Sequence, residues 1–478
     1  MKTDNRSKIR KYLLTQIGQP TGRVRLYTFD ANNSPYLKRS TALKIEEYMK
    51  NYQNQGSKPR WIIIPGLRGV GKTTLLAQLY TSLDINPNYK LYISLDEVKG
   101  ILDISLYDIL DVYEEILGKI FETLDKPVYL FLDEVQYEKG WADILRVIFN
   151  RSKKVFILCT GSSALSLQTN ADVSRKSDMV KLYPLSFPEY LLIRNQRQMN
   201  EPLGDAIKEA IFNAENAEQA YTQLKALQTQ VTQLWILDRL NLDRYIKYGT
   251  LPFALQITDE GRIYSRIEQT FNNIRIKDIP QLGKFENSTI EKVGSVLYAL
   301  SSSDIAGLNK LGKTLGLAEN TLRDLFNVFE RSELLIKVSP YASNLGQVKK
   351  PSKYLFLSSA YRSMFFNVFG SIMSYDKYKG RLLEDIVGLY LNKLLDLSVG
   401  SSLSYDVTEG GADFIVKFLN ERKIAIEVGF EKKGFNQLEN TMKRIPCNYG
   451  ISISPSELIM SESKNMLLVP LEYFLLIQ

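Results

Sequence analysis

Short apolar runs alternate with amphipathic stretches between residues 60 and 185 of this 478-residue chain. The runs are rich in Val, Ile, Leu and aromatic residues, and they predict strands at residues 61–65, 90–95, 128–132, 155–159 and 179–183. Most of the intervals between them have a helical period. Because strands that alternate with helices are typical of βαβ units, this part of the chain is predicted to form an α/β domain with a parallel sheet.

The pattern becomes helical after residue 200. One apolar face between about residues 203 and 245 is marked by leucines and a valine spaced three or four apart: Leu224, Leu227, Val231, Leu234 and Leu237. A helical pair or a short coiled coil fits this spacing. A second helical region, 286–335, leads into the strand-like LLIKVSPY and KYLFL, and from Gly380 a helix is followed by the strands DFIV and IAIEV.

Composition places the chain among folded globular proteins, with 44% hydrophobic and 24% charged residues. A chain of 478 residues is too long for one core, so three or four domains are expected. The net charge of +8 is compatible with nucleic acid binding but does not require it. Since the opening lacks a signal-peptide core and no run reaches the roughly 18 apolar residues of a membrane span, a cytoplasmic protein with no membrane partner is expected.

The chain contains no histidine. This excludes Ser-His-Asp and Cys-His nucleophile pairs and histidine metal sites, so that any acid or base catalyst must be a carboxylate or a lysine. The two cysteines, Cys159 and Cys447, are far apart in the sequence. They indicate a reducing compartment and exclude a thiol zinc site.

The segment GLRGVGKT (66–73) follows an apolar strand and precedes the helical LLAQLYTSL. It matches the phosphate-loop motif G-x-x-x-x-G-K-[ST] in the context that the motif requires. Its glycines allow backbone N–H groups to surround the phosphates of ATP. The predicted nucleotide-binding residues are Gly66, Gly69, Gly71, Lys72, Thr73 and Thr74. Lys72 is expected to reach the β and γ oxygens, Thr73 to ligate Mg²⁺, and Thr74 to extend the site toward the α-phosphate.

Two acidic residues end the apolar run VYLFLDEV, at the sheet edge where ligands bind in open α/β folds. Asp133 is expected to hold Mg²⁺ through water, and Glu134 to orient and deprotonate the attacking water. Acidic pairs after strands are also common as solvated turns. The next strand ends in CTGSSA, where Thr160, Ser162 and Ser163 are candidates to touch the γ-phosphate or its water, or simply form a polar strand exit.

The order of phosphate loop, LFLDEV, TGSSA and LYPLSFPEYL resembles a prokaryotic AAA+ ATPase family related to the STAND and origin-recognition ATPases, over residues 20–350. The resemblance implies a P-loop AAA+ core with a helical lid. It also implies a catalytic arginine near the phosphates of its own subunit or of a neighbouring subunit in a homo-oligomer. Arg175 is at the matching position, although Ser174 precedes it where the family usually has glycine. A surface arginine is the alternative.

The segment YGTLP (248–252) resembles the lid motif of the same family, in which the proline packs near the nucleotide. Pro252 is at that position, and Thr250 replaces a glycine. The helical stretch 203–245 is a departure from the family, and it offers a surface for a protein partner.

Residues 286–370 resemble the winged helix that follows the lid, with a turn at Gly316 and a recognition helix over 319–331. That helix has a net charge of minus one, whereas DNA-binding helices are usually basic. The wing favours DNA contact more, because it contains three lysines: Lys349, Lys350 and Lys353. Charged loops are, however, often only solvated.

From Gly380 the pattern resembles a restriction-endonuclease-like domain of PD-(D/E)xK type. The resemblance implies that Glu384, Asp413 and Glu427 converge on one Mg²⁺ for phosphodiester hydrolysis. The lysine expected two residues after Glu427 is Gly429, so cleavage should be weak unless the next turn supplies a lysine, Lys432 or Lys433. An inactive fold used for binding is favoured.

The predicted domains are an ATPase core (1–195), a lid with the helical insertion (196–285), a winged helix (286–370) and a nuclease-like domain (371–478). Three functions fit. The first is a Mg-ATP-dependent switch that acts on DNA or a DNA-associated partner; the second is an ATP-gated DNA nuclease. The third is a poorly hydrolysing scaffold that recognises a protein.

Overall fold

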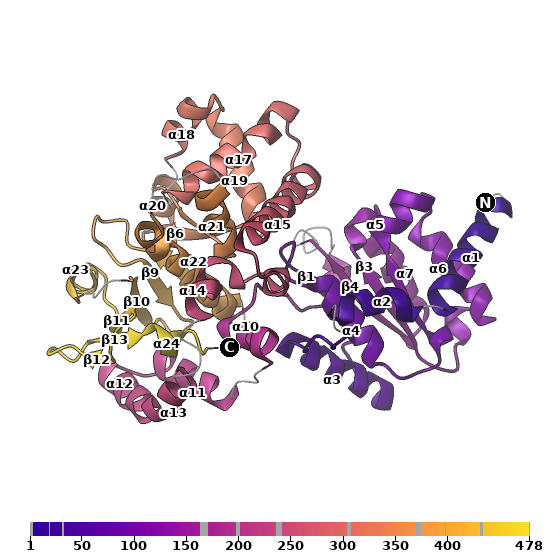
Figure 1. The fold of residues 1–478 in the computed structure, drawn as a ribbon, viewed down its shortest axis with the longest axis horizontal. Helices are drawn as coiled ribbons and strands as arrows, with labels where there is room; N and C mark the ends of the chain where they lie inside the picture. The colour runs from indigo at the N-terminus through magenta and orange to yellow at the C-terminus, as the bar shows by residue number, and fades with distance from the viewer. Residues whose placement is uncertain are drawn as a thin grey trace. The chain divides into compact units, whose positions relative to one another are not determined.

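A computed structural model describes residues 3–18, 20–30, 33–162, 171–196, 201–235, 241–303, 307–368, 374–396, 398–430 and 434–477. The chain divides into two compact units, Met1–Tyr183 and Pro184–Gln478, which we describe separately (Figure 1). Within the described ranges, no helix combines the length and the apolar character that crossing a membrane requires.

The first unit contains a five-stranded parallel sheet in the order β2-β3-β4-β1-β5. The strands are β1 (Trp61–Pro65), β2 (Lys90–Ser94), β3 (Val128–Asp133), β4 (Val155–Gly161) and β5 (Asp178–Met179). The predicted parallel α/β sheet is therefore confirmed. The last strand is shorter than predicted, yet the chain continues beside β1, because the amides of Val180 and Leu182 donate to the carbonyls of Ile63 and Pro65.

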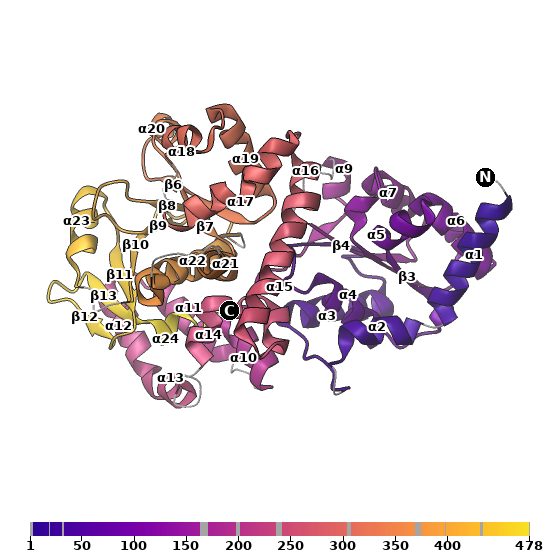
Figure 2. The same cartoon turned by 45° about the horizontal axis from the view of Figure 1, so that its top comes forward.

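Helices cover both faces of this sheet, which explains why its strands are apolar on both sides (Figure 2). One face packs against α1 (Thr3–Gly18), α6 (Leu106–Leu117) and α7 (Trp141–Arg151). The other packs against α3 (Ser40–Gln55) and α4 (Lys72–Ser82), with Tyr52 and Tyr80 in aromatic contacts with β3. The described part of this unit also contains α2 (Pro20–Thr28), α5 (Leu95–Glu97) and α9 (Ala171–Ser174).

The second unit begins before α10 (Phe187–Asn195), so the boundary lies at Tyr183 instead of the predicted residue 195. Aromatic packing explains the difference. The ring of Phe187 lies 5.1 Å from that of Tyr245, and its backbone N–H donates to the Tyr390 hydroxyl at 2.7 Å. These contacts join α10 to later parts of the chain.

An eight-stranded sheet forms the centre of the second unit, in the order β12-β13-β11-β10-β9-β8-β6-β7. Its strands are β6 (Leu335–Pro340), β7 (Lys353–Phe356), β8 (Ser402–Tyr405), β9 (Phe414–Lys417), β10 (Lys423–Val428), β11 (Tyr449–Ser454), β12 (Ile459–Met460) and β13 (Met466–Pro470). The antiparallel pair β6–β7 joins the other strands through parallel pairing of β6 with β8. The regions expected to form a winged helix and a nuclease-like domain therefore share one sheet, which the sequence did not predict.

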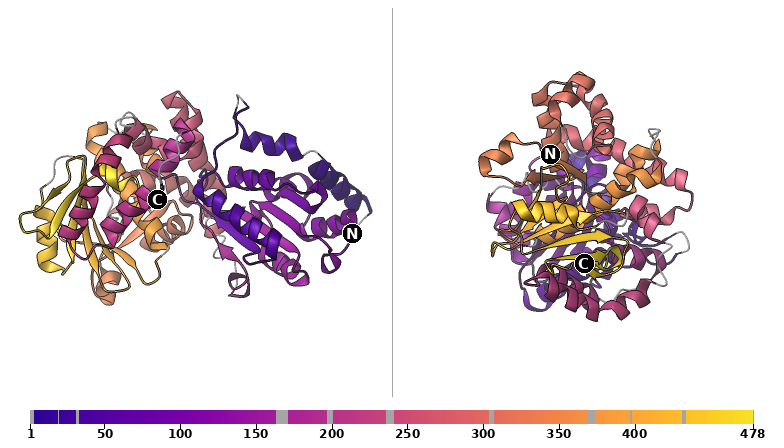
Figure 3. Two further views of the ribbon diagram at one scale, coloured as in Figure 1. Left: turned by 90° about the horizontal axis from the view of Figure 1, so that it is seen from below. Right: turned by 90° about the vertical axis from the view of Figure 1, so that its left-hand side faces the viewer.

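Helices surround this sheet on both faces (Figure 3). On one face lies α22 (Tyr375–Asp396), and on the other α23 (Asn436–Arg444), whose Leu438 packs with Ala425 of β10. The predicted helix, turn and helix before β6 are present, because α18 (Leu308–Leu315) ends at Gly316 with φ +62° and α19 (Glu319–Arg331) follows. The unit also contains α14 (Leu242–Arg244), α15 (Glu260–Asn273), α16 (Ile279–Leu282), α17 (Asn287–Ser301), α20 (Asn344–Lys349), α21 (Ser359–Val368) and α24 (Leu471–Phe474).

The helical insertion packs within the second unit. Its helices α11 (Glu201–Phe212), α12 (Ala217–Ala226) and α13 (Gln228–Trp235) lie near the C-terminal strands (Figure 1). The Tyr449 hydroxyl donates to the carbonyl of Ile211 at 2.7 Å, and Leu224 and Val231 of the predicted apolar face are buried. Leu237 lies outside the described residues. The apolar face thus supports the fold of this unit.

Candidate functional site

The phosphate loop connects β1 to α4 at the carboxyl edge of the parallel sheet. Gly69 and Gly71 have φ values of +93° and +96°, a backbone conformation that favours glycine. A Cβ at Gly66 would lie 2.5 Å from the Leu182 carbonyl oxygen. The three glycines of the motif are therefore required by backbone geometry, and Thr73 and Thr74 lie in the first turn of α4.

Two buried cations hold this loop. Lys72 Nζ donates to the carbonyls of Gly66 and Leu67 at 2.8 and 3.2 Å. Arg39 donates to the carbonyl of Val70 at 3.0 Å and to that of Tyr183 at 2.9 Å. No sequence pattern pointed to Arg39, because it precedes the motif by more than twenty residues and belongs to no motif itself.

Asp133 is 2% exposed at the end of β3, beside the loop. Its carboxylate accepts hydrogen bonds from the hydroxyls of Thr160 and Thr73. Burial, followed by the charge of Glu134, raises the pKa of Asp133 to about 6, against the effect of the two hydroxyls and of Lys72. The structure thus brings Lys72, Thr73, Asp133 and Thr160 together at one end of the sheet.

Glu134 has a left-handed backbone conformation, with φ 55° and ψ 47°. This conformation is unfavourable for a residue with a side chain and is often found at functional sites. The Glu134 N–H donates to Thr160 Oγ1 at 3.3 Å, and its carboxylate accepts a hydrogen bond from the Gln136 amide. Gln136 also accepts from the Ser162 N–H at 3.3 Å. Gln136 therefore connects the Glu134 side chain to the end of β4, a contact that the sequence did not predict. Ser163 lies outside the described residues.

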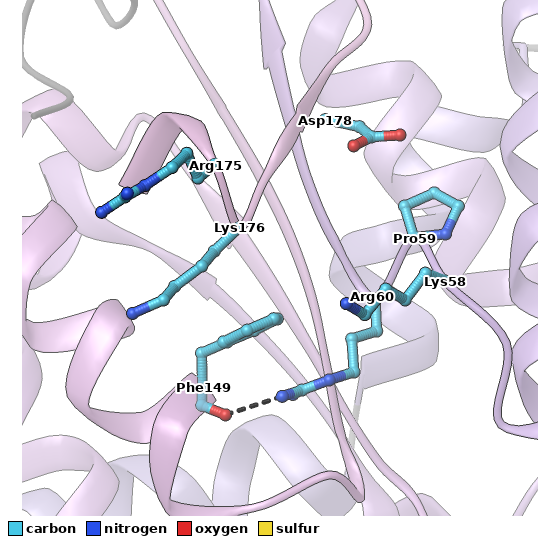
Figure 4. A pocket seen from close by; sticks show the side chains of 7 residues that line it. All are labelled: Lys58, Pro59, Arg60, Phe149, Arg175, Lys176 and Asp178. Atoms are coloured by element: carbon cyan, nitrogen blue, oxygen red, sulfur yellow. Dashed lines mark hydrogen bonds between the residues drawn. The ribbon is translucent and has the colours of Figure 1, made fainter. Parts of the chain in front are cut away.

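Arg175 lies at the opposite edge of the sheet. It follows α9 and precedes β5, whose first residue pairs with Ile62 near the start of β1. It lines a hollow of about 230 Å³ together with Lys58, Pro59, Arg60, Phe149, Lys176 and Asp178 (Figure 4). Its side chain is 77% exposed and pairs with Asp172 at 3.2 Å. The five residues of β1, roughly 16 Å of strand, separate this edge from the phosphate loop of the same chain.

The lid-like motif lies in the second unit, where Gly249 ends a short π-helix and Pro252 begins a 3₁₀ helix. A Cβ at Gly249 would lie 2.7 Å from the Tyr190 ring, so glycine is required there. Thr250, which replaces a glycine of the family pattern, is buried and shares a 2.7 Å hydrogen bond with Ser358. The substitution therefore has a structural partner in this chain.

The predicted C-terminal metal ligands do not form a metal site in the described part of the chain. No group of three or more His, Cys, Asp or Glu side chains there is placed to hold an ion. Lys353 instead pairs with Glu384 at 2.6 Å and with Asp413 at 3.0 Å, while Glu427 is buried in β10. Lys353 is therefore not a wing surface lysine. Lys432 and Lys433 lie outside the described residues.

A basic groove of about 780 Å³ lies between the β6–α20 region and strands β8, β9 and β10. Lys417 and Lys423 are directly opposite each other in the antiparallel pair β9–β10, and Ser402 is opposite Lys417 on β8. Like charges in such positions repel unless an anion lies near them. The cationic side chains that line the groove are Lys350, Lys417, Lys423 and Arg444. The anionic ones are Asp406 and Glu421.

Comparison with known proteins adds the family. Residues 58–191 match an AAA domain, and residues 239–369 match a domain of unknown function (DUF8612). The chain is 35% identical to the uncharacterised protein MJ1637 of Methanocaldococcus jannaschii over 91% of this chain and 87% of that one. The chain belongs to the MJ1637 family. An uncharacterised Haemophilus influenzae protein is 24% identical over 81% of this chain and 86% of its own length.

The AAA match of this MJ1637-family chain includes the phosphate loop, Asp133, Glu134 and Arg175. Among solved structures, the Aeropyrum pernix ORC1 protein in complex with DNA is similar at 13% identity and a TM-score of 0.34, over 72% of this chain and 97% of that one. A TM-score at this level does not bear on what the MJ1637-family chain binds.

Proposed function

We propose that the chain is a Mg-ATP-binding AAA+ ATPase whose nucleotide state acts as a switch for the second unit. The observation that carries the proposal is the meeting of the phosphate loop, Asp133 and Glu134 at one edge of a parallel sheet. Loop amides and the N-terminus of α4 favour phosphate oxygens there, and Lys72 supplies a buried cation.

The chemistry of this site fits Mg²⁺. The ion prefers hard oxygen ligands, and the Thr73 hydroxyl and Asp133 carboxylate are two such groups side by side. When bound, it would neutralise charge on the β- and γ-phosphates. Lys72 and the two threonine hydroxyls favour the ionised form of Asp133, which this role requires.

Glu134 is proposed as the general base, in a chain that has no histidine for that role. The Gln136 amide orients its carboxylate, and the Thr160 hydroxyl fixes its backbone. Thr160 thereby links the metal ligand Asp133 to the base, so a movement of one residue is transmitted to the other.

Arg175 is proposed to act on the nucleotide of a neighbouring copy. It is at the amino edge of its own sheet and exposed, whereas the phosphates of its own chain would bind at the carboxyl edge. Of the two positions that the family resemblance implies, the described geometry supports the one between subunits. The proposal therefore includes a homo-oligomer.

DNA is proposed as the partner of the switch, bound through the basic groove. The predicted recognition helix offers little for DNA, because Arg323 pairs with Glu319 and Arg331 donates to the carbonyl of Leu282. In the groove, by contrast, Lys350 and Lys423 line the hollow, and Lys423 Nζ lies 5.7 Å from the centre of the Tyr341 ring. Lysine and hydroxyl groups in rows are suited to phosphate contacts.

Phosphate release from ATP tests the proposal against its two alternatives. The account predicts turnover that Glu134→Gln removes while ATP binding stays. Binding without turnover in the unaltered chain would favour the nucleotide-binding scaffold. Cleavage of plasmid DNA with Mg²⁺ or Mn²⁺, lost in Asp413→Ala, would favour the ATP-gated nuclease.

A further inference from the structure

A lysine lies where the second unit was expected to hold a metal ion. Lys353, the first residue of β7, is 6% exposed. Its ammonium nitrogen is 2.6 Å from Oε2 of Glu384 on α22 and 3.0 Å from Oδ1 of Asp413 before β9. The sequence has Gly429 where the nuclease-like pattern expects a lysine, so this cation comes from a different strand and a different predicted module.

A backbone amide and an aromatic ring hold Asp413 and the ammonium group in place. The second oxygen of Asp413 accepts the backbone N–H of Val428 at 2.9 Å. The ammonium also lies 5.1 Å from the centre of the Phe414 ring, an arrangement that stabilises a cation. A divalent ion would need the same carboxylate oxygens and would be repelled by the ammonium charge.

The neighbouring residue on α22 has a partner of the same kind. Asp385 forms a two-pronged pair with Arg362 of α21, at 2.6 and 2.8 Å, and both side chains are fully buried. Arg362 also donates to the carbonyl of Ser301 at 2.8 Å. Consecutive acidic residues of α22 thus each bind a cation from the preceding part of the chain. Together they connect α22 to β7 and α21.

We propose that the Lys353 ammonium group occupies the position between Glu384 and Asp413 that a divalent ion would need, and thereby excludes such an ion. The same two ion pairs fix the β6–β7 pair to the nuclease-like core. The fixed pair in turn holds one wall of the basic groove, because β6 contributes Ser339 to that groove. The proposal goes beyond the proposed ATPase function and does not depend on it. In this account the C-terminal part of the chain binds without cleaving.

Manganese binding followed by electron paramagnetic resonance tests this inference on the full chain. Every sample carries Asp133→Asn, which removes the carboxylate proposed for the nucleotide site, and none contains nucleotide. With Lys353 present, no bound Mn²⁺ is expected at millimolar concentration. Lys353→Met should create a Mn²⁺ site whose dissociation constant is at least tenfold below that millimolar concentration. A further Asp413→Asn change should abolish this site. Lys377→Met, at an exposed lysine of α22, is the matched control and should change nothing.

Two outcomes overturn the inference. One is stoichiometric Mn²⁺ binding with Lys353 intact that is lost in Asp413→Asn, a measurement that needs no folded Lys353 variant. The other is a folded Lys353→Met chain that still binds no Mn²⁺, which would show that the lysine is not what excludes the ion. Should Lys353→Met unfold, the neutral triple change Lys353→Met, Glu384→Gln, Asp413→Asn should fold, because no charge is then left unpaired. A triple variant that also unfolds would contradict the role assigned to charge.

Discussion

The proposed nucleotide site and the C-terminal carboxylates Glu384 and Asp413 use the same kinds of residue in opposite ways. In the first, Lys72 donates to neutral carbonyls, and Asp133 accepts from hydroxyls. In the second, Lys353 pairs directly with Glu384 and Asp413. A lysine and a carboxylate that are not paired with each other remain available for phosphate and metal. In our proposal, Lys353 occupies both carboxylates of the second site and closes that site to a divalent ion.

The largest difference between the two sites is expected in catalysis. Glu134→Gln should lower ATP turnover about 10³-fold, within the range for loss of a general base, and leave ATP affinity nearly unchanged. Phosphate release at saturating ATP measures it. Glu427→Gln, the same change in the C-terminal cluster, is the matched control and should leave turnover as it is. Equal turnover in Glu134→Gln and the unaltered chain would remove Glu134 as the base.

Arg175→Ala should lower turnover about 10²-fold without weakening ATP binding, because a cation near the γ-phosphate acts mainly on charge that develops in the transition state. Mixing this variant with Lys72→Ala provides a sharper test. The Lys72→Ala chain is expected to bind ATP too weakly to turn it over but to offer its Arg175 to the neighbour, so part of the turnover should return. No recovery in mixtures that form oligomers would contradict action between subunits.

The pH dependence of the free energy of unfolding in mild acid should report on Asp133. The pKa of Asp133 is about 6 in the folded chain, above its ordinary value of 3.8, so the folded state holds more protons than the unfolded state between these values. This residue therefore lowers the free energy of unfolding as the pH rises from about 4 to about 6, by ~3 kcal/mol. Urea unfolding without nucleotide measures this effect in the unaltered chain and in Asp133→Asn. The free energy of unfolding of the variant, relative to that of the unaltered chain, should be higher at pH 7 than at pH 4 by this amount. A constant difference across the range would contradict the raised pKa.

The smallest effect is expected in the basic groove. Lys423→Glu should weaken binding of duplex DNA about tenfold and reduce the slope of log affinity against log salt by about one. Fluorescence anisotropy at several salt concentrations measures both. Lys225→Glu, an exposed lysine on α12, is the control for net charge. An equal loss in both variants would show that only total charge matters.

Local patterns predicted the first unit better than the second. The sheet, the phosphate loop and the Asp133–Glu134 pair depend on short segments whose meaning is set by neighbours in sequence. The pairing of Lys353 with Glu384 depends on strand β7 joining the edge of the sheet, which no local pattern specifies. Arg39 and Gln136 were missed for a similar reason, since their roles come from hydrogen bonds made in the folded chain.

The central claim is that Lys72 is a ligand-binding lysine and Lys353 a structural one. Calorimetric titration of Mg-ATP into the unaltered chain and the variants Lys72→Ala and Lys353→Met tests it most directly. The account predicts one ATP per chain in the unaltered protein and in folded Lys353→Met. It predicts a loss of affinity of at least about 10²-fold in Lys72→Ala, because Lys72 is the one of these two lysines that is proposed to contact the phosphates. Unchanged ATP binding in Lys72→Ala would contradict it.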